Sequence, residues 1–111
     1  MCLFCKIVSK EIPSKVVFEN DDFLAFHDIY PKAPVHILII PKKHIVSFDD
    51  VDSQTMANIT PFIQEVALKA GIKESGYRLI TNIGSDGLQE VKHLHFHLLG
   101  GAKLGGNSFG K

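Results

Sequence analysis

Three histidines alternate with apolar residues near the end of the chain, at His93, His95 and His97. In an extended strand alternate side chains point to the same face, so the three imidazoles share one face and the intervening apolar residues share the other. Neighbouring rings on that face start about 6.6 Å apart, close enough to surround one phosphate group. We expect the apolar face to pack in the core and the histidine face to meet a ligand.

Three interpretations of this pattern differ in their chemistry. The first is a polar sheet face that is incidentally rich in histidine. The second is a zinc site, because H-x-H on a strand is a known ligand spacing. The third is covalent catalysis at phosphorus, in which a neutral ring attacks through one nitrogen while a hydrogen bond to the other nitrogen fixes the tautomer, and a neighbouring histidine protonates the leaving group. We favour the third, which requires no cofactor, because regular spacing of three histidines is unusual on an incidental polar face.

The loop before the histidines, residues 82–91, has the composition of an anion-binding loop. Gly84 and Gly87 permit backbone conformations that turn N–H groups toward a ligand, and Asn82 and Gln89 add side-chain amides. Such a loop alone is common in proteins of many kinds. Next to three histidines it indicates a phosphate site.

A second pair of reactive side chains lies at the start of the chain, where Cys2 and Cys5 form a C-x-x-C motif. The sequence shows neither a signal peptide nor an apolar run near the ~20 residues of a membrane helix, so we predict a cytoplasmic protein with no membrane partner. Cysteines there stay reduced, and this spacing suits a metal or redox pair better than a structural disulfide.

Composition limits the fold and the partners. The 111 residues are 45% hydrophobic and 22% charged, which suits one globular domain over residues 1–111, with a flexible glycine-rich tail at 105–111. Twelve basic and twelve acidic residues cancel, so the chain lacks the basic excess typical of a protein that binds a nucleic-acid polymer. A small anionic ligand is compatible with this balance.

Periodicity predicts the elements that must position these residues. Strands are expected at residues 16–19, 23–28, 35–40, 77–82 and 94–99, the third being a buried central strand in which His36 is the one polar residue. A main helix is expected over residues 53–70, with Ser53 as N-cap and Gly71 after its end. Pro61 either kinks this helix or marks a second helix capped by Thr60. The pattern predicts an α+β fold with an antiparallel sheet.

These motifs together resemble the Hint branch of the histidine triad (HIT) family of nucleotide hydrolases and transferases. The resemblance lies in the H-φ-H-φ-H-φ-φ run, where φ is apolar, and in the stretches KIVSKEIPSKVVFEND, FLAFHDIYPKAPVHILIIPKKHI and NIGSDGLQEVKHLHFHLLGG. It implies a HIT-like fold, with a five-stranded antiparallel sheet, one main helix and a short N-terminal helix. It also implies a homodimer across which the sheet continues, with the main helix and the C-terminal segment at the interface.

The resemblance also implies a role for each site residue. His95 would be the nucleophile, His97 and His36 would contact or orient the phosphate, and His93 would maintain the hydrogen-bond order of the triad. Other residues would bind the nucleotide: the phosphate would meet Asn82, Gln89 and the Val91 backbone, the ribose would meet Asp28, and the base would lie among Leu3, Phe4, Ile7, Ile12, Phe26 and Leu38.

The activity implied is hydrolysis of the P–N bond of purine nucleoside 5'-phosphoramidates through a nucleotidyl-histidine intermediate, with AMP or GMP as the nucleotide. Two alternatives remain. One is a dinucleoside polyphosphate hydrolase or nucleotidyl transferase of the same superfamily, and the other is a non-catalytic nucleotide- or zinc-binding interaction module. The Q-x-V-x-H-x-H-x-H-x-x-G-G run favours the phosphoramidase.

Two further features bear on the details of the site. The C-x-x-C motif resembles that of the zinc-binding subset of the family, which implies a structural zinc held by Cys2, Cys5, His44 and His93. Glu90 occupies a position where close relatives often have serine, and Leu88 one where glycine is common. Because a carboxylate pointing inward would repel a phosphate, we expect Glu90 to point away from it.

Overall fold

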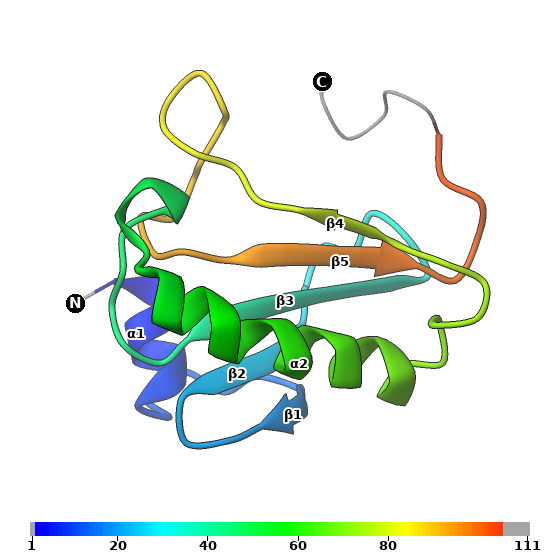
Figure 1. Cartoon of the computed structure of the whole chain (residues 1–111), viewed down its shortest axis with the longest axis horizontal. Coiled ribbons are helices and arrows are strands. Elements are labelled where there is room, and N and C mark those ends of the chain that lie inside the picture. Colours follow the sequence, from blue (N-terminus) through cyan, green and yellow to red (C-terminus); the bar gives the residue numbers. More distant parts are fainter. Residues whose placement is uncertain (1, 106–111) are drawn as a thin grey trace.

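The computed structural model describes residues 2–105 and contains one five-stranded antiparallel sheet, in the order β1-β2-β3-β5-β4, with two α-helices (Figure 1). The α+β prediction is therefore confirmed. Along the chain the elements are α1 (Leu3–Val8), β1 (Val16–Glu19), β2 (Phe23–His27), β3 (Val35–Pro41), the short 3-10 helix η1 (Phe48–Asp50), α2 (Ser53–Lys69), β4 (Arg78–Ile80) and β5 (Phe96–Gly100). Apart from Gly105, the predicted tail lies outside the described residues.

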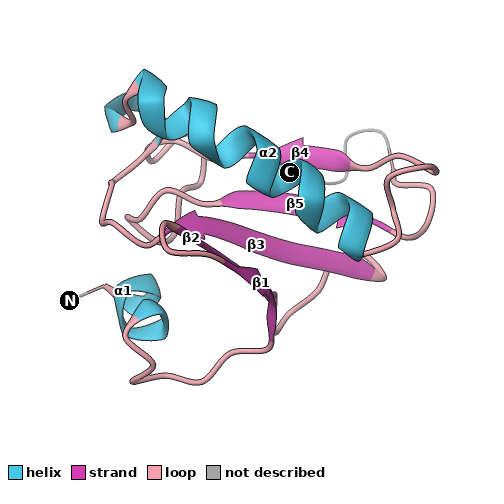
Figure 2. Cartoon of the chain, turned by 60° about the horizontal axis from the view of Figure 1, so that its bottom comes forward, coloured by secondary structure: helices cyan, strands magenta, loops and turns pink. Residues whose placement is uncertain are grey.

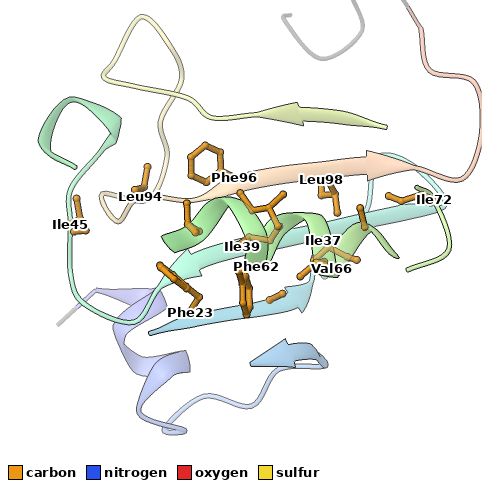
Figure 3. Close-up of a cluster of buried hydrophobic side chains, with 14 residues drawn as sticks. Phe23, Ile37, Ile39, Ile45, Phe62, Val66, Ile72, Leu94, Phe96 and Leu98 are labelled. Carbon is orange, nitrogen blue, oxygen red and sulfur yellow. The ribbon is translucent and has the colours of Figure 1, made fainter. Parts of the chain in front are cut away.

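The two helices cover opposite faces of the sheet (Figure 2). Strand β3 is the central strand, and its side chains alternate between two cores as the period of two requires. Ile37 and Ile39 enter the larger core beneath α2, with Val66 of that helix (Figure 3). Ile59 of α2 belongs to the same core. Leu38 and its neighbours on the other face enter a smaller core beneath α1, which contains Phe4, Ile7, Leu24, Phe26, Leu38 and Ile40. The prediction of a strand covered on both faces is correct.

Helix α2 continues through Pro61 without a second start at Thr60, so that alternative is wrong. Its N-cap is Asp52, whose carboxylate accepts hydrogen bonds from Thr55, rather than the predicted Ser53, which begins the helix. A carboxylate at this position also complements the helix dipole. Gly71 follows the helix with a φ of +76°, as the sequence predicts.

The last two strands are shorter than predicted, and this affects the triad. Strand β5 begins at Phe96, so His93 and His95 precede the paired part of the strand. The backbone of this segment is held by other partners, because Leu94 N donates to Ile45 O at 2.6 Å and the Thr81 hydroxyl donates to His95 O at 2.8 Å. The predicted alternation survives, since Leu94 and Phe96 enter the larger core and the histidines face the other side.

The long connection between β4 and β5 loops out at the end of the sheet where α1 lies (Figure 1). It brings the predicted phosphate loop near the N-terminal helix. Within residues 2–105, no helix is long and apolar enough to cross a membrane.

Candidate active site

Strands β3 and β5 place His36 and His97 side by side. Leu38 pairs with His97 in the antiparallel register, so His97 points to the α1 face, as His36 does. His36 Nε2 and His97 Nδ1 are 3.0 Å apart, and the His95 and His97 ring centroids are 5.1 Å apart. Phe4 of α1 meets the His95 ring edge-on at 5.0 Å. Two strands and one helix therefore converge on this site.

The hydrogen bonds of His93 and His95 determine where their protons lie. His93 Nε2 is 2.8 Å from the Pro41 carbonyl oxygen, and His95 Nδ1 is 2.7 Å from the His93 carbonyl oxygen. A carbonyl oxygen only accepts, so each of these nitrogens carries the proton. Burial lowers the pKa of both rings, which favours their neutral forms. His95 is thus left with a lone pair on Nε2, which is the form a nucleophile requires.

His36 and His97 form a hydrogen-bond relay. The Lys32 backbone N donates to His36 Nδ1 at 3.1 Å, so the neutral His36 ring carries its proton on Nε2 and donates it to His97 Nδ1. Neutral His97 then carries its own proton on Nε2. Burial lowers the pKa of His36, and burial together with the neighbouring histidines lowers the pKa of His97 to about 4. His97 therefore presents a neutral N–H donor.

The two histidines of this relay, together with Asp28, form a cluster that resembles a metal site. Ligand atoms of Asp28, His36 and His97 lie within 4.8 Å of one another, and Asp28 Oδ2 is 3.5 Å from His36 Nε2. To bind a cation through Nε2, His36 would have to move its proton to Nδ1 and lose the bond from Lys32 N. We interpret this cluster as a proton-ordering relay rather than a metal centre.

A pocket of about 280 Å³ opens beside the triad. Its floor is formed by the buried side chains Phe4, Leu38 and His95, and its half-buried walls include Asp28, Asn82, Val91 and His97. The outer part, which we call the pocket rim, consists of the exposed residues Tyr30, Lys32, Leu88 and Glu90. A nucleotide requires such a concave site with apolar walls and a few polar groups.

Several predicted nucleotide residues line this pocket, namely Phe4, Asp28, Leu38, Asn82, Val91, His95 and His97. Ile7, Ile12 and Phe26 instead pack in the smaller core between α1 and the sheet, and the Leu3 side chain is exposed. Their contact with a base stays a prediction.

Gln89 holds its own loop together. Its Oε1 accepts from Gly84 N at 3.1 Å, and its Nε2 donates to the carbonyl oxygens of Val46 at 2.6 Å and Val91 at 3.1 Å. Asn82 Nδ2 similarly donates to Gly87 O at 2.8 Å. These side chains shape the phosphate loop, and direct binding of phosphate by Gln89 stays a prediction.

The pocket rim contains residues that the sequence analysis did not place in the site. Tyr30 and Lys32 were missed, and their proximity to Asp28 in the chain is the signal that could have indicated them. Glu90 differs from the expectation, because it lines the pocket instead of pointing away. Burial lowers the pKa of His95, and the hydrogen bond to the His93 backbone and the negative charges of Asp28 and Glu90 act in the opposite direction.

A second constellation lies behind the triad at the N-terminus of α1. Cys2 Sγ caps this helix by accepting from Cys5 N, and the two sulfurs are 3.0 Å apart. His44 Nδ1 lies 3.2 Å from Cys5 Sγ, and His93 Nδ1 lies 3.3 Å from Cys2 Sγ. Because the proton of His93 is on Nε2, its Nδ1 lone pair faces the sulfurs. The structure thus brings the four predicted zinc ligands together, with their ligand atoms within 4.8 Å of one another.

The lowered pKa of His97 predicts a pH dependence of stability. An imidazole in the unfolded chain has a pKa near 6.5, whereas the pKa of folded His97 is about 4. Between these two pH values the unfolded state binds a proton that the folded state does not bind. The free energy of unfolding therefore falls as the pH drops from about 6.5 to about 4, and above about 6.5 it does not depend on this group. The expected loss is about 1 kcal/mol per pH unit. Urea denaturation in chelator, at pH values from 7.5 to about 5, measures it. His97→Asn should flatten the slope, and the exposed His27→Asn should not. An unchanged slope in His97→Asn would contradict this assignment.

Comparisons with known proteins agree with this geometry. A HIT domain matches residues 9–104. An uncharacterised HIT-like protein of Helicobacter pylori is 52% identical over 103 residues, covering 93% of this chain and 99% of that protein. The purine nucleoside phosphoramidase of Escherichia coli is 46% identical over 106 residues, covering 93% and 89% respectively. A solved HIT family hydrolase from Legionella pneumophila superposes with a TM-score of 0.90 at 52% identity, covering 95% of this chain and 96% of that one. The chain belongs to the HIT domain family.

Proposed function

We propose that this protein hydrolyses the P–N bond of purine nucleoside 5'-phosphoramidates with His95 as the nucleophile. One observation carries the proposal: the bond from His95 Nδ1 to the His93 carbonyl leaves an Nε2 lone pair on the ring that forms the pocket floor. The relative from Escherichia coli that is named for this activity supports the choice of substrate class. A module that only binds nucleotides has no need of a buried, neutral histidine ordered in this way.

The reaction proceeds in two displacements. His95 Nε2 forms a bond to phosphorus as the P–N bond breaks, and the departing nitrogen takes a proton from water at the open side of the pocket. Water then attacks the phosphorus, the N–P bond to His95 breaks, and the proton lost by that water neutralises the hydroxide left by the first step. Nucleoside monophosphate and amine are released, and His95 returns to its starting form.

His97 stabilises charge in this scheme. Its Nε2–H can donate to a phosphoryl oxygen, where negative charge collects in the transition state. Complete transfer of that proton would leave an imidazolate, because His97 Nδ1 already accepts from His36. We therefore assign His97 to hydrogen bonding of the phosphoryl group and the His36 relay to fixing its tautomer.

We further propose a structural zinc held by Cys2, Cys5, His44 and His93. Two thiolates and two imidazoles form a donor set suited to tetrahedral zinc, and the four ligand atoms already converge. Burial and the neighbouring Cys2 raise the pKa of the Cys5 thiol, so a cation at this point is what would favour the thiolate. Bound zinc would join α1 to the segment carrying His93, whose carbonyl orients His95. The two displacements use the histidines alone.

We also propose that two copies of the chain form a homodimer along β4. This strand is at the edge of the sheet, and Leu79 pairs with buried Leu98 yet is itself 43% exposed. Leu68 of α2 and Tyr77 are exposed as well and line one groove. An edge strand beside exposed apolar side chains is a surface that natural proteins usually cover.

Replacement of His95 tests the proposed catalysis. His95→Ala should lower kcat for adenosine 5'-phosphoramidate at least about a thousandfold, since no other group replaces the nucleophile, while the affinity for AMP changes by less than about threefold. Acid quenching of wild type with labelled substrate should trap a nucleotidylated protein. His27→Ala, on an exposed neighbour of Asp28, is the matched control. Equal turnover by His95→Ala would refute the assigned nucleophile.

Metal analysis tests the zinc proposal. Protein purified without chelator should contain about one zinc per chain, as a four-ligand site requires. Cys5→Ser should lower this content and reduce the Tm by several degrees, because the metal links α1 to the rest of the fold. Ser9→Ala, just after the same helix, should retain the zinc. A content far below one zinc per chain in the wild type would end this proposal.

Sedimentation tests the homodimer. The wild type should sediment with twice the mass of the chain, and Leu79→Glu should shift it to the monomer, because a charge would be buried without a partner. Ile29 is 82% exposed and lies away from β4, so Ile29→Glu introduces the same charge outside the proposed interface and should leave the dimer intact. A wild-type monomer at micromolar concentration would contradict the prediction.

A further inference from the structure

Leu88 on the pocket rim has a backbone conformation that leucine rarely adopts. Its φ is +63°, in the left-handed region where a Cβ atom crowds the following carbonyl group. Its side chain is 60% exposed, so apolar packing does little to offset this strain. The turn is closed by Leu88 N to Ser85 O at 3.1 Å and by Gln89 N to Gly84 O at 3.0 Å. A strained residue fixed at a site and exposed to solvent points to a functional role.

Two charged residues of the rim act on different parts of the site. Glu90 is two residues after Leu88, and its negative charge opposes the effect of burial on the pKa of His95. The positive charge of Lys32 acts with burial to lower the pKa of His36 and His97. The backbone N–H of Lys32 donates to His36 Nδ1 of the relay, whereas Glu90 belongs to the same loop as Leu88 and lines the pocket with it. Tyr30, which is 76% exposed, adds a large aromatic surface to the rim.

The direction of attack identifies which part of a substrate meets the rim. In a displacement at phosphorus the attacking and leaving atoms are roughly in line. His95 is only 6% exposed and forms the floor of the pocket, so the leaving group departs toward the mouth. The mouth is lined by the four exposed rim residues. The leaving amine is thus the part of the substrate that reaches them.

We propose that Tyr30, Leu88 and Glu90 form a subsite for the leaving amine, which selects an apolar stem ending in a positive charge. This inference rests on the proposed phosphoramidase function and specifies its substrate class. Leu88 and Tyr30 offer apolar surface to the stem, and the Glu90 carboxylate attracts a terminal ammonium group and repels a terminal carboxylate. The two hydrogen bonds that close the turn keep the Leu88 side chain at the mouth despite the strain.

A matched series of adenosine 5'-phosphoramidates tests the charge selection. The leaving amines are ammonia, butylamine, 1,4-diaminobutane and 4-aminobutanoate. For the wild type, kcat/KM for the diaminobutane compound should exceed that for the aminobutanoate compound at least about fivefold, since each exposed charge contact contributes about two- to fivefold. The ratio should shrink in high salt, because rim charges are screened.

Variants of the same loop identify the residues responsible. Glu90→Gln should bring the charge ratio, which is kcat/KM for the diaminobutane compound divided by kcat/KM for the aminobutanoate compound, close to 1. Asp86 is an exposed carboxylate of the same loop that does not line the pocket, so Asp86→Asn should leave this ratio unchanged. Leu88→Gly should reduce the preference for butylamine over ammonia by about two- to fivefold. It should also raise the Tm by about 2–5 °C, since glycine adopts this φ without strain.

The outcomes separate this inference from the proposed function. Hydrolysis of all four compounds at equal kcat/KM, or a charge ratio that persists in Glu90→Gln, would overturn the subsite and leave the phosphoramidase intact. A lower Tm for Leu88→Gly would overturn the strain argument and with it the role of Leu88. Failure of the wild type to hydrolyse any of the four would overturn the proposed function itself, and the subsite with it.

Discussion

The hydrogen bond from His95 Nδ1 to the His93 carbonyl oxygen, 2.7 Å long, is the interaction on which the site depends. It fixes the tautomer of the ring and therefore which nitrogen keeps its lone pair. Its strength depends on His93 staying in place, and His93 is held in turn by Pro41 O and by the cysteine cluster. The histidine triad and the Cys2–Cys5 pair are thus connected. His93 contacts the cysteines, and its backbone carbonyl oxygen orients His95.

Burial keeps the histidine rings neutral and so preserves the positions of their protons. Each of His36, His93 and His95 is less than a tenth exposed, and burial is the largest cause of the lowered pKa of each. A protonated ring would donate from both nitrogens and destroy the relay, so desolvation protects the pattern of donors and acceptors. No buried side-chain nitrogen or oxygen among the described residues lacks a hydrogen-bond partner. The described buried polar side chains of the site therefore all have hydrogen-bond partners.

The sequence predicted the parts of the structure that depend on local pattern. A nearly continuous apolar run that includes Ile37 and Ile39 indicated the central strand, and helical spacing indicated α2. The late start of β5, which leaves His95 before the paired strand, was missed because the groups that hold this segment are distant in the chain. Ile45 O accepts from Leu94 N, and the Thr81 hydroxyl donates to His95 O. Tyr30 and Lys32 were missed for a similar reason. They follow β2, whereas Leu88 and Glu90 belong to the loop before β5, and only the tertiary fold joins the four residues. Glu90 was expected to point away because a carboxylate repels phosphate, yet it lines the pocket.

Strand β5 is the last strand in the chain, yet it lies between β3 and β4 in the sheet. During synthesis on the ribosome, strands β1 to β4 emerge before the residues that will separate β3 from β4. Until β5 arrives, the central strand β3, which is buried from His36 to Pro41, presents an open apolar edge, which is a template for pairing with other chains. Three of the four histidines of the candidate site, His93, His95 and His97, arrive with or just before this closing strand. Completion of the sheet and assembly of the candidate site are therefore one event, and a chain that has not finished folding has not yet brought these rings together.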